Sequence, residues 1–153
     1  DEDRDLSLSA TFNNVGAQLK SFDGRTERVP FDFRLGLTKG MDHLPVRFSV
    51  TMADLTRWKT DDYFHADGEK LNFGRKLLNH FAVGLDVLPT SYLYLSAGYN
   101  FRRASELKAA GSGHGAGLTF GGGLTLSRFK AGISYARYHV SSSSLMFNVA
   151  YSL

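Results

Sequence analysis

Hydrophobic and polar residues alternate along most of the chain. The C-terminal segment shows this most clearly, because Leu145, Phe147 and Val149 fall on one side of an extended chain and Met146 and Asn148 on the other. A period of two residues is typical of a strand whose two faces meet different environments. The same pattern recurs in eight segments, which we predict to be strands: 6–13, 31–38, 46–52, 81–87, 92–101, 118–126, 129–136 and 145–153.

The two faces of these predicted strands differ in size as well as in polarity. One face carries large apolar side chains, whereas the other is rich in Gly, Ser, Thr and Ala, with occasional charges such as Asp32, Arg47 and Asp86. A closed membrane barrel, apolar outside and polar or small inside, produces this pattern, and a soluble barrel inverts it. We therefore predict an all-β, antiparallel up-and-down transmembrane β-barrel of about eight strands. The residues expected to face lipid are Phe31, Phe33, Leu35, Phe48, Val50, Phe81, Val83, Leu85, Leu93, Leu95, Tyr99, Phe129, Ile133, Tyr135, Phe147, Val149, Tyr151 and Leu153.

The connections between the predicted strands alternate between long and short. In chain order they cover 14–30, 38–45, 53–79, 88–91, 102–116 and 127–128, followed by a Ser-rich one at 139–144. Outer-membrane barrels have short turns on the periplasmic side and longer loops on the outside. We therefore expect the long connections to face outward and both chain ends to lie on the periplasmic side, which requires an even number of strands. Tyr and Trp near the predicted strand ends suit an aromatic girdle at the membrane interface: Trp58, Tyr92, Tyr94, Tyr99, Tyr135 and Tyr138.

Composition agrees with a single β domain over residues 1–153 and excludes several other classes. The 16 glycines, three prolines and 13% aromatic residues favour strands and turns. Cysteine is absent, which rules out disulfides, thiolate metal sites and Cys nucleophiles. A net charge of +3 is too small a bias to indicate nucleic acid. The uncharged run 109–127 contains seven glycines, so a spanning helix is implausible there.

No catalytic or metal-binding signature is present, and we predict a protein that is not an enzyme and has no cofactor. The five histidines lie in separate connections or at strand starts, without the close spacing that metal ligands show. Ser141 to Ser144 lack a nucleophile elbow and an accompanying acid and histidine.

The long connection 53–79 is charged and aromatic. It contains Asp61-Asp62-Tyr63-Phe64-His65 and runs on to a segment, 69–79, in which a short helix is possible. Two interpretations remain open, a surface loop that folds over the rim or a plug or docking segment for a partner. For the second, the candidate docking residues are Trp58, Tyr63, Phe64 and Phe73.

Several stretches of the chain resemble a known family. They are 12–16, reading Phe-Asn-Asn-Val-Gly, 44–51 with its continuation 55–58, 80–103 with Gly-Tyr-Asn-Phe-Arg-Arg at its end, and 135–139. These residues resemble the PorQ family of outer-membrane barrels of the Bacteroidetes type IX secretion system. They are scattered structural residues and form no catalytic signature.

This resemblance implies a FadL-like barrel related to PorV, located in the bacterial outer membrane. It would hold a PorZ-like surface protein beside the PorU sortase in the cargo-attachment complex. Family members are roughly twice as long, so the chain resembles their C-terminal portion. The eight strands would then belong to a barrel of about fourteen strands.

Two other functions are compatible with the same pattern. One is a FadL-like transport barrel for hydrophobic solutes, which a wide apolar lumen would favour. The other is a soluble lipocalin-like ligand-binding barrel, which has a similar length and strand count but needs its large apolar face turned inward.

Overall fold

The computed structural model describes residues 5–16, 31–59, 63–64, 72–111, 115–137, 139 and 141–152. Their elements are β1 (Leu6–Asn13), β2 (Asp32–Met41), β3 (Leu44–Met52), α1 (Phe73–Asn79), β4 (Phe81–Thr90), β5 (Leu93–Asn100), α2 (Phe101–Ala109), β6 (Leu118–Leu126), β7 (Phe129–Ala136) and β8 (Ser144–Tyr151). The eight segments predicted to be strands all form strands, and the short helix expected within 69–79 is α1. The predicted all-β class and up-and-down order are confirmed.

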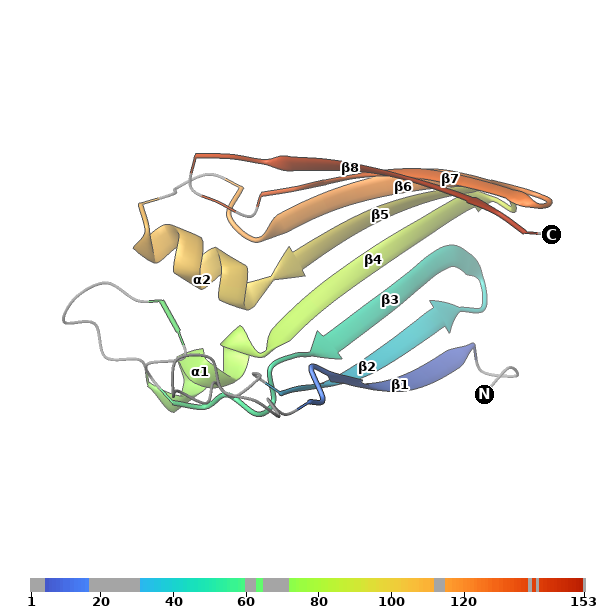
Figure 1. Cartoon of the computed structure of the whole chain (residues 1–153). Coiled ribbons are helices and arrows are strands. Elements are labelled where there is room, and N and C mark those ends of the chain that lie inside the picture. The colour runs from blue at the N-terminus through green and yellow to red at the C-terminus, as the bar shows by residue number, and fades with distance from the viewer. Residues whose placement is uncertain are drawn as a thin grey trace.

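The strands form one antiparallel sheet in which each strand pairs with its neighbours in chain order, from β1 to β8. Figure 1 shows a single curved sheet with α1 and α2 together at one end of it. The sheet is open, because among the described residues β1 pairs only with β2 and β8 only with β7. Closure into a barrel is therefore not part of the described fold.

The register aligns the apolar rows of all eight strands on one face. Leu37 of β2 lies opposite Val50 of β3, which in turn lies opposite Val83 of β4. Farther along the sheet, Phe120 of β6 pairs with Tyr135 of β7. Partners across an antiparallel ladder point to the same side, so the rows merge into one continuous surface, which we call the apolar face. Within the described strands the only charged residue on it is Lys39, next to the β2–β3 turn.

The opposite surface, which we call the small face, is crowded although its side chains are small. A Cβ atom added to Gly84 of β4 would lie 2.5 Å from the Ser49 hydroxyl oxygen of β3. The one large aromatic side chain on this face in the described strands, Tyr94 of β5, places its hydroxyl beside Gly123 and Gly132. Tyr94 therefore points away from the apolar face, unlike Tyr99 and Tyr135, which lie on it.

The connections alternate in length as expected. Pairs of residues link β2 to β3, β4 to β5 and β6 to β7, whereas the other end of the sheet carries the longer connections that contain α1 and α2. Helix α2 was not predicted, and Phe101, assigned to a strand from the alternation, is its first residue. The cause is local, since the Asn100 side chain accepts a hydrogen bond from the Arg103 backbone amide and caps the helix. Ala104 and Leu107 then supply its buried side.

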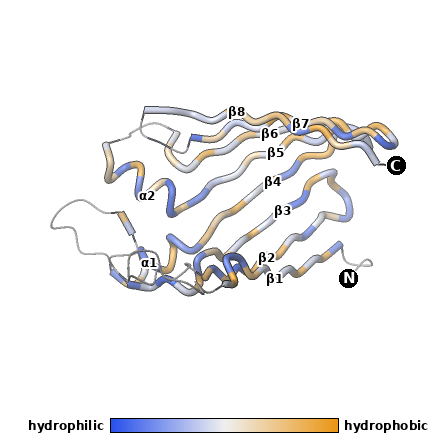
Figure 2. Tube along the Cα trace, in the orientation of Figure 1, coloured by the Kyte–Doolittle hydropathy of each residue, from blue (hydrophilic) through white to orange (hydrophobic). Residues whose placement is uncertain are grey.

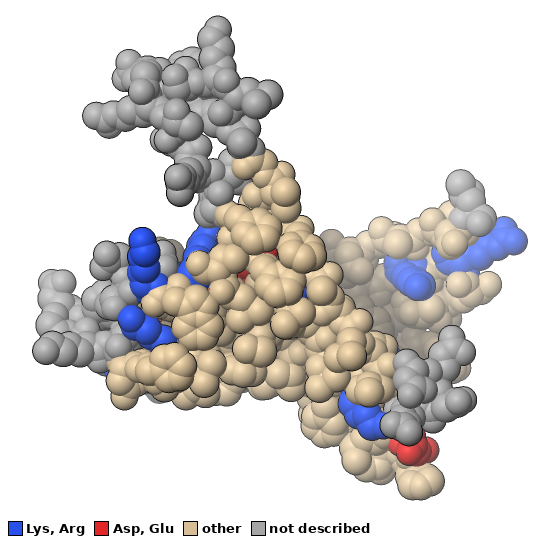
Figure 3. Space-filling model, turned by 90° about the horizontal axis from the view of Figure 1, so that it is seen from below, with Lys and Arg blue, Asp and Glu red and all other residues tan. Residues whose placement is uncertain are grey.

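Burial is inverted relative to a soluble domain. Most large apolar side chains of the sheet are exposed, up to 80% for Leu8, and the buried apolar residues among those described are only Tyr63, Ala104, Leu107, Ala116 and Ala136. Figure 2 shows hydrophobic and hydrophilic positions alternating along the strands. In Figure 3, Lys and Arg lie toward the ends of the molecule, and uncharged residues cover the wide area between them. The sheet thus presents its large hydrophobic residues outward.

Candidate functional site

Polar side chains gather at the end of the sheet that carries the long connections. Asp32, the first residue of β2, is 2% exposed, and one of its carboxylate oxygens accepts the backbone amide of Asp54 at 3.0 Å. The other oxygen accepts a hydrogen bond from Arg34. Asp54 lies just after β3 with a φ of 56°, a left-handed conformation that Asp tolerates better than most residues. The Asp32 carboxylate therefore holds the turn after β3 against the start of β2.

Arg102 connects this turn to helix α2. Its guanidinium donates to the Asp54 carboxylate and to the Glu106 carboxylate, at 2.8 Å in each case. It also lies 5.1 Å from the centre of the Tyr63 ring, within the range of a cation–π contact. Burial opposes its charge, but Glu106 and Asp54 outweigh that effect and raise the pKa of Arg102 above its ordinary value. Arg102 is therefore a permanent cation.

A buried histidine holds the long connection between β3 and β4 in place. His80, which is 1% exposed, contacts the Ala53 carbonyl oxygen through Nδ1 at 2.8 Å and the Tyr63 hydroxyl through Nε2 at 2.9 Å. The Tyr63 hydroxyl also donates to the Arg57 carbonyl oxygen at 2.7 Å. Tyr63 is 3% exposed, so it serves this internal network and is not accessible to a partner as the docking interpretation supposed.

The other three candidate docking residues are exposed. Trp58 stacks on Phe73 with ring centres 6.2 Å apart, and it also packs on His80 with ring centres 4.1 Å apart. Phe73, at the start of α1, is 71% exposed, and Phe64 is exposed as well. Trp58 and Phe73 thus stack on each other, and Phe64 is exposed in the same connection between β3 and β4. We call these three residues the aromatic patch.

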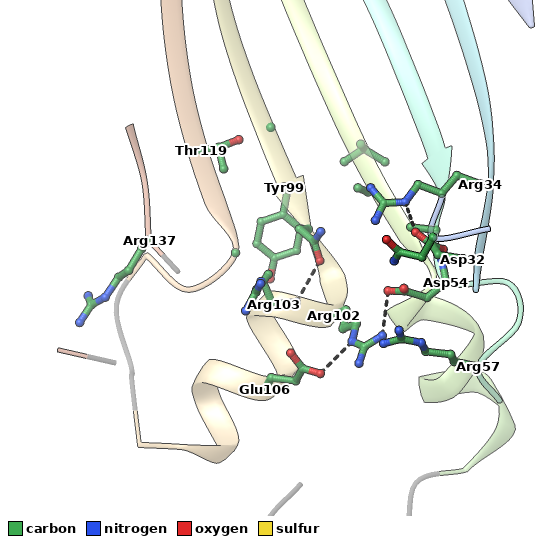
Figure 4. Close-up of a pocket in the computed structure, with 17 residues that line it drawn as sticks. Asp32, Arg34, Asp54, Arg57, Tyr99, Arg102, Arg103, Glu106, Thr119 and Arg137 are labelled. Carbon is green, nitrogen blue, oxygen red and sulfur yellow. Dashed lines mark hydrogen bonds and ion pairs between the residues drawn. The ribbon is translucent and has the colours of Figure 1, made fainter. Parts of the chain in front are cut away.

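Asp32 and Arg102, together with the groups that pair with them, line a cavity of about 620 Å³. Its walls come from β2, the turn after β3, β4, β5, α2, β6 and the residue that follows β7. The charged residues among them are Asp32, Arg34, Asp54, Arg57, Arg102, Arg103, Glu106 and Arg137. Figure 4 shows the ion pairs of Arg34 and Arg102 at its wall, with Arg57 pointing toward Asp54 and Arg102. The cavity is therefore polar and rich in arginine.

The expected lipid-facing residues share the apolar face wherever the structure describes them in strands. Those that are most exposed belong to β8, namely Phe147, Val149 and Tyr151. Phe31 precedes β2 and stacks on Phe12 at 6.1 Å. Leu153 lies outside the described residues. Gly122 interrupts the apolar row, and the Leu95 side chain packs closely over it, with Cδ2 3.1 Å from the position that a Cβ would take.

Sequence reasoning missed Asp32, Asp54, His80 and Arg102 as parts of one site. One local signal was available, since Arg102 and Glu106 are four residues apart, the spacing of an ion pair on a helix. The contact between Arg102 and Asp54 joins residues 48 positions apart and has no local signal.

The described residues include no group of three or more acidic or histidine side chains placed to hold a metal ion. No helix among them has both the length and the apolar character needed to cross a bilayer. Comparison with protein-family models, with curated proteins and with solved structures finds no match to this chain.

Proposed function

We propose that the chain forms the wall of a β-barrel in a bacterial outer membrane. The observation that carries this proposal is the apolar face, because one charged residue, Lys39, interrupts an otherwise uncharged surface that runs across all eight described strands. The strands are eight to ten residues long, which suits a tilted spanning strand of about nine to eleven residues. Burying the exposed aromatic and aliphatic side chains in hydrocarbon removes them from water.

The open edges of the sheet add a requirement to this proposal. Backbone amides and carbonyls without partners cost several kcal/mol each in hydrocarbon, so an edge strand has to be paired there. β1 and β8 therefore either pair with each other or with further strands of a larger barrel. The resemblance to the PorQ family favours the larger barrel.

Within that barrel we propose the role that the resemblance implies, a non-enzymatic component of the type IX secretion system. The long-connection end would face the outside and hold a PorZ-like surface protein beside the PorU and PorV attachment complex. The aromatic patch supports this, because exposed aromatic side chains are the common anchors of protein interfaces. Phe64 and Phe73 project without being needed for the Tyr63–His80 network.

The two alternative functions have less support. A transporter of hydrophobic solutes needs an apolar lumen, whereas the small face carries Gly, Ser and Thr with charges at Arg47 and Asp86. A soluble lipocalin-like barrel needs its large apolar face enclosed, whereas that face is the more exposed one here.

The membrane proposal is tested by cysteine accessibility, since the sequence contains no cysteine. Single cysteines are placed at four successive positions of β8, from 146 to 149, in protein reconstituted into lipid vesicles. A membrane-impermeant maleimide is expected to label Met146→Cys and Asn148→Cys and to spare Phe147→Cys and Val149→Cys. A lipid-soluble quencher is expected to reach a fluorophore at the latter two positions only. Equal aqueous labelling at all four positions, or the opposite alternation, would refute the membrane assignment.

The docking role is tested by co-purification with the PorZ-like protein. Phe64→Ala combined with Phe73→Ala is expected to reduce recovery of the partner about tenfold. Tyr92→Ala is the matched control, because Tyr92 is an exposed aromatic residue at the opposite end of the strands. Equal recovery with the double variant and the control would exclude the aromatic patch as the docking surface.

A further inference from the structure

The cavity at the long-connection end has a size and construction that suit a small ligand. Its volume of about 620 Å³ lies within the usual range of small-molecule sites. Residues from four strands, one helix and the connections between them line it, and Asp32, at its wall, is buried and hydrogen-bonded on both carboxylate oxygens. The walls are therefore held by an ordered network.

The charge of the lining residues is unbalanced. The residues that line the cavity include five arginines and three carboxylates, and Figure 4 shows the Arg137 side chain pointing away from the others. Arg34 pairs with Asp32, and Arg102 takes both Asp54 and Glu106. All three carboxylates of the lining thus have a guanidinium partner, and two of them share one. The surplus on the lining is positive.

Arg57 contributes to that surplus directly. In the part of the chain that the structure describes, no carboxylate pairs with its guanidinium, and its only described hydrogen bonds are made by its backbone, to Asp54 and Tyr63. Figure 4 shows the side chain reaching toward Arg102, so two guanidinium groups approach the same side of the cavity. Two neighbouring cations repel each other, and the Asp54 carboxylate beside them already pairs with Arg102, so a further anion close to both would lower this repulsion.

Helix α2 adds to the positive potential. Its N-terminal residues, with Asn100, Arg102 and Arg103, line the cavity. The N-terminus of a helix carries a partial positive charge that favours anions. Guanidinium groups present paired N–H donors that match the oxygens of a phosphate or a carboxylate.

We propose that this cavity binds a small anionic solute through a phosphate or carboxylate group, with Arg57 as the principal ligand and Arg102 as the residue that positions it. Arg102 is held by Asp54 and Glu106 and so keeps the α2 wall in place, whereas Arg57 supplies an uncommitted guanidinium. The proposal rests on the cavity and its charges and does not depend on the membrane assignment or on a secretion partner.

Binding is measured on the full chain in detergent micelles at constant ionic strength. Inorganic pyrophosphate is the phosphate probe and citrate the carboxylate probe, each titrated by calorimetry and by the fluorescence of Trp58, the single tryptophan, which adjoins Arg57. Arg57→Gln is expected to weaken binding of the preferred probe about tenfold. Arg57→Lys keeps the charge but loses the paired donors, so it is expected to restore only part of the affinity. Arg128→Gln, which removes the same charge in the β6–β7 turn at the opposite end, is expected to leave binding unchanged.

The two probes distinguish a phosphate site from a carboxylate site, and preference for either one supports the proposal. Equal weakening by Arg57→Gln and Arg128→Gln would mean that only net charge matters and would overturn it. Failure of both probes to bind at about 10 mM, where even weak sites fill, would also overturn it. Because the Arg57 guanidinium makes no ion pair with a described carboxylate, unchanged melting of both Arg57 variants is the expected check that the fold is intact.

Discussion

The guanidinium of Arg102 and the carboxylate of Asp54 meet at 2.8 Å, although 48 positions separate them in the chain. Their ion pair joins the turn after β3 to helix α2, and both side chains are about one-fifth exposed. Two consecutive long connections are thereby fastened together at one end of the sheet. This contact makes the long-connection end an ordered structure on which a cavity and an aromatic patch can both be built.

Removing Arg102 is expected to loosen that end of the molecule. Arg102→Gln leaves the carboxylates of Asp54 and Glu106 without a cation in a half-buried setting, and we expect a loss of about 2 kcal/mol in the free energy of unfolding after allowing for solvent screening. Denaturant unfolding in micelles, followed by Trp58 fluorescence, measures it. Lys108→Gln, an exposed cation on the same helix, is the control and should cost much less. An equal loss in both variants would show that the ion pairs contribute nothing specific.

The Tyr63–His80 hydrogen bond is expected to show energetic coupling. Tyr63→Phe removes the hydroxyl from a buried network and should cost about 1 kcal/mol, and His80→Leu, which also loses the Ala53 contact, about 2 kcal/mol. The double variant should be less destabilised than the sum, with a coupling energy of about 1 kcal/mol. His43→Leu, in the short β2–β3 turn, is the control. Strict additivity in the cycle would argue against direct interaction of the two side chains.

Substituting two glycines that precede β6 is expected to distinguish the cost of backbone strain from the cost of a steric clash. Gly115 and Gly117 have φ values of 69° and 81°, but a Cβ at Gly115 meets nothing within 4 Å, whereas one at Gly117 lies 2.5 Å from the Asn100 carbonyl oxygen. Gly115→Ala should therefore cost about 1 kcal/mol from its left-handed backbone alone. Gly117→Ala should cost about 3 kcal/mol or more, because it adds overpacking against α2. Thermal melts of the two variants compare them directly, and equal costs would rule out the close approach.

Charges on the two faces of β8 are expected to differ in their effect on membrane insertion. Phe147→Arg places a cation on the apolar face and should destabilise the inserted protein by about 2–4 kcal/mol if it lies near the bilayer centre. Asn148→Arg places the same charge on the small face and should be tolerated. The measurement is refolding from urea into lipid vesicles. Similar refolding of both variants would contradict the proposed orientation of the sheet.

The strands were predictable because their signal is local. A period of two residues assigns each side chain to one of two faces, and each face is chemically uniform over eight segments. Helix α1 was also predictable, because its signal is local too. Helix α2 was missed because Tyr99 and Phe101 continue the alternation of β5, while the Asn100 cap and the Arg102–Glu106 spacing indicate a helix from the same residues. Where two local patterns overlap, packing of Ala104 and Leu107 decides between them.

The candidate docking residues were predicted less well than the strands. Of the residues expected to dock a partner, Phe64 and Phe73 are exposed but Tyr63 is buried against His80. An aromatic residue in a charged loop has the same local pattern in either case. Burial of Tyr63 depends on a histidine 17 positions away and on a carbonyl of Arg57, and neither partner is marked by spacing.

By itself, the sequence determined the strands, the side chains that lie on each face of a strand, and the alternation of short and long connections. All three depend on residues that are neighbours along the chain. Only the tertiary structure decided that Asp32, Asp54, Arg57 and Arg102 surround one cavity. The physical reason is that antiparallel pairing brings the start of β2, the end of β3, the end of β5 and the start of β6 to the same end of the sheet. Charged residues that are far apart in the sequence meet there, and some of them pair while others do not. The alternation along the chain thus predicts the apolar face, whereas the polar cavity at the long-connection end depends on strand pairing between distant residues.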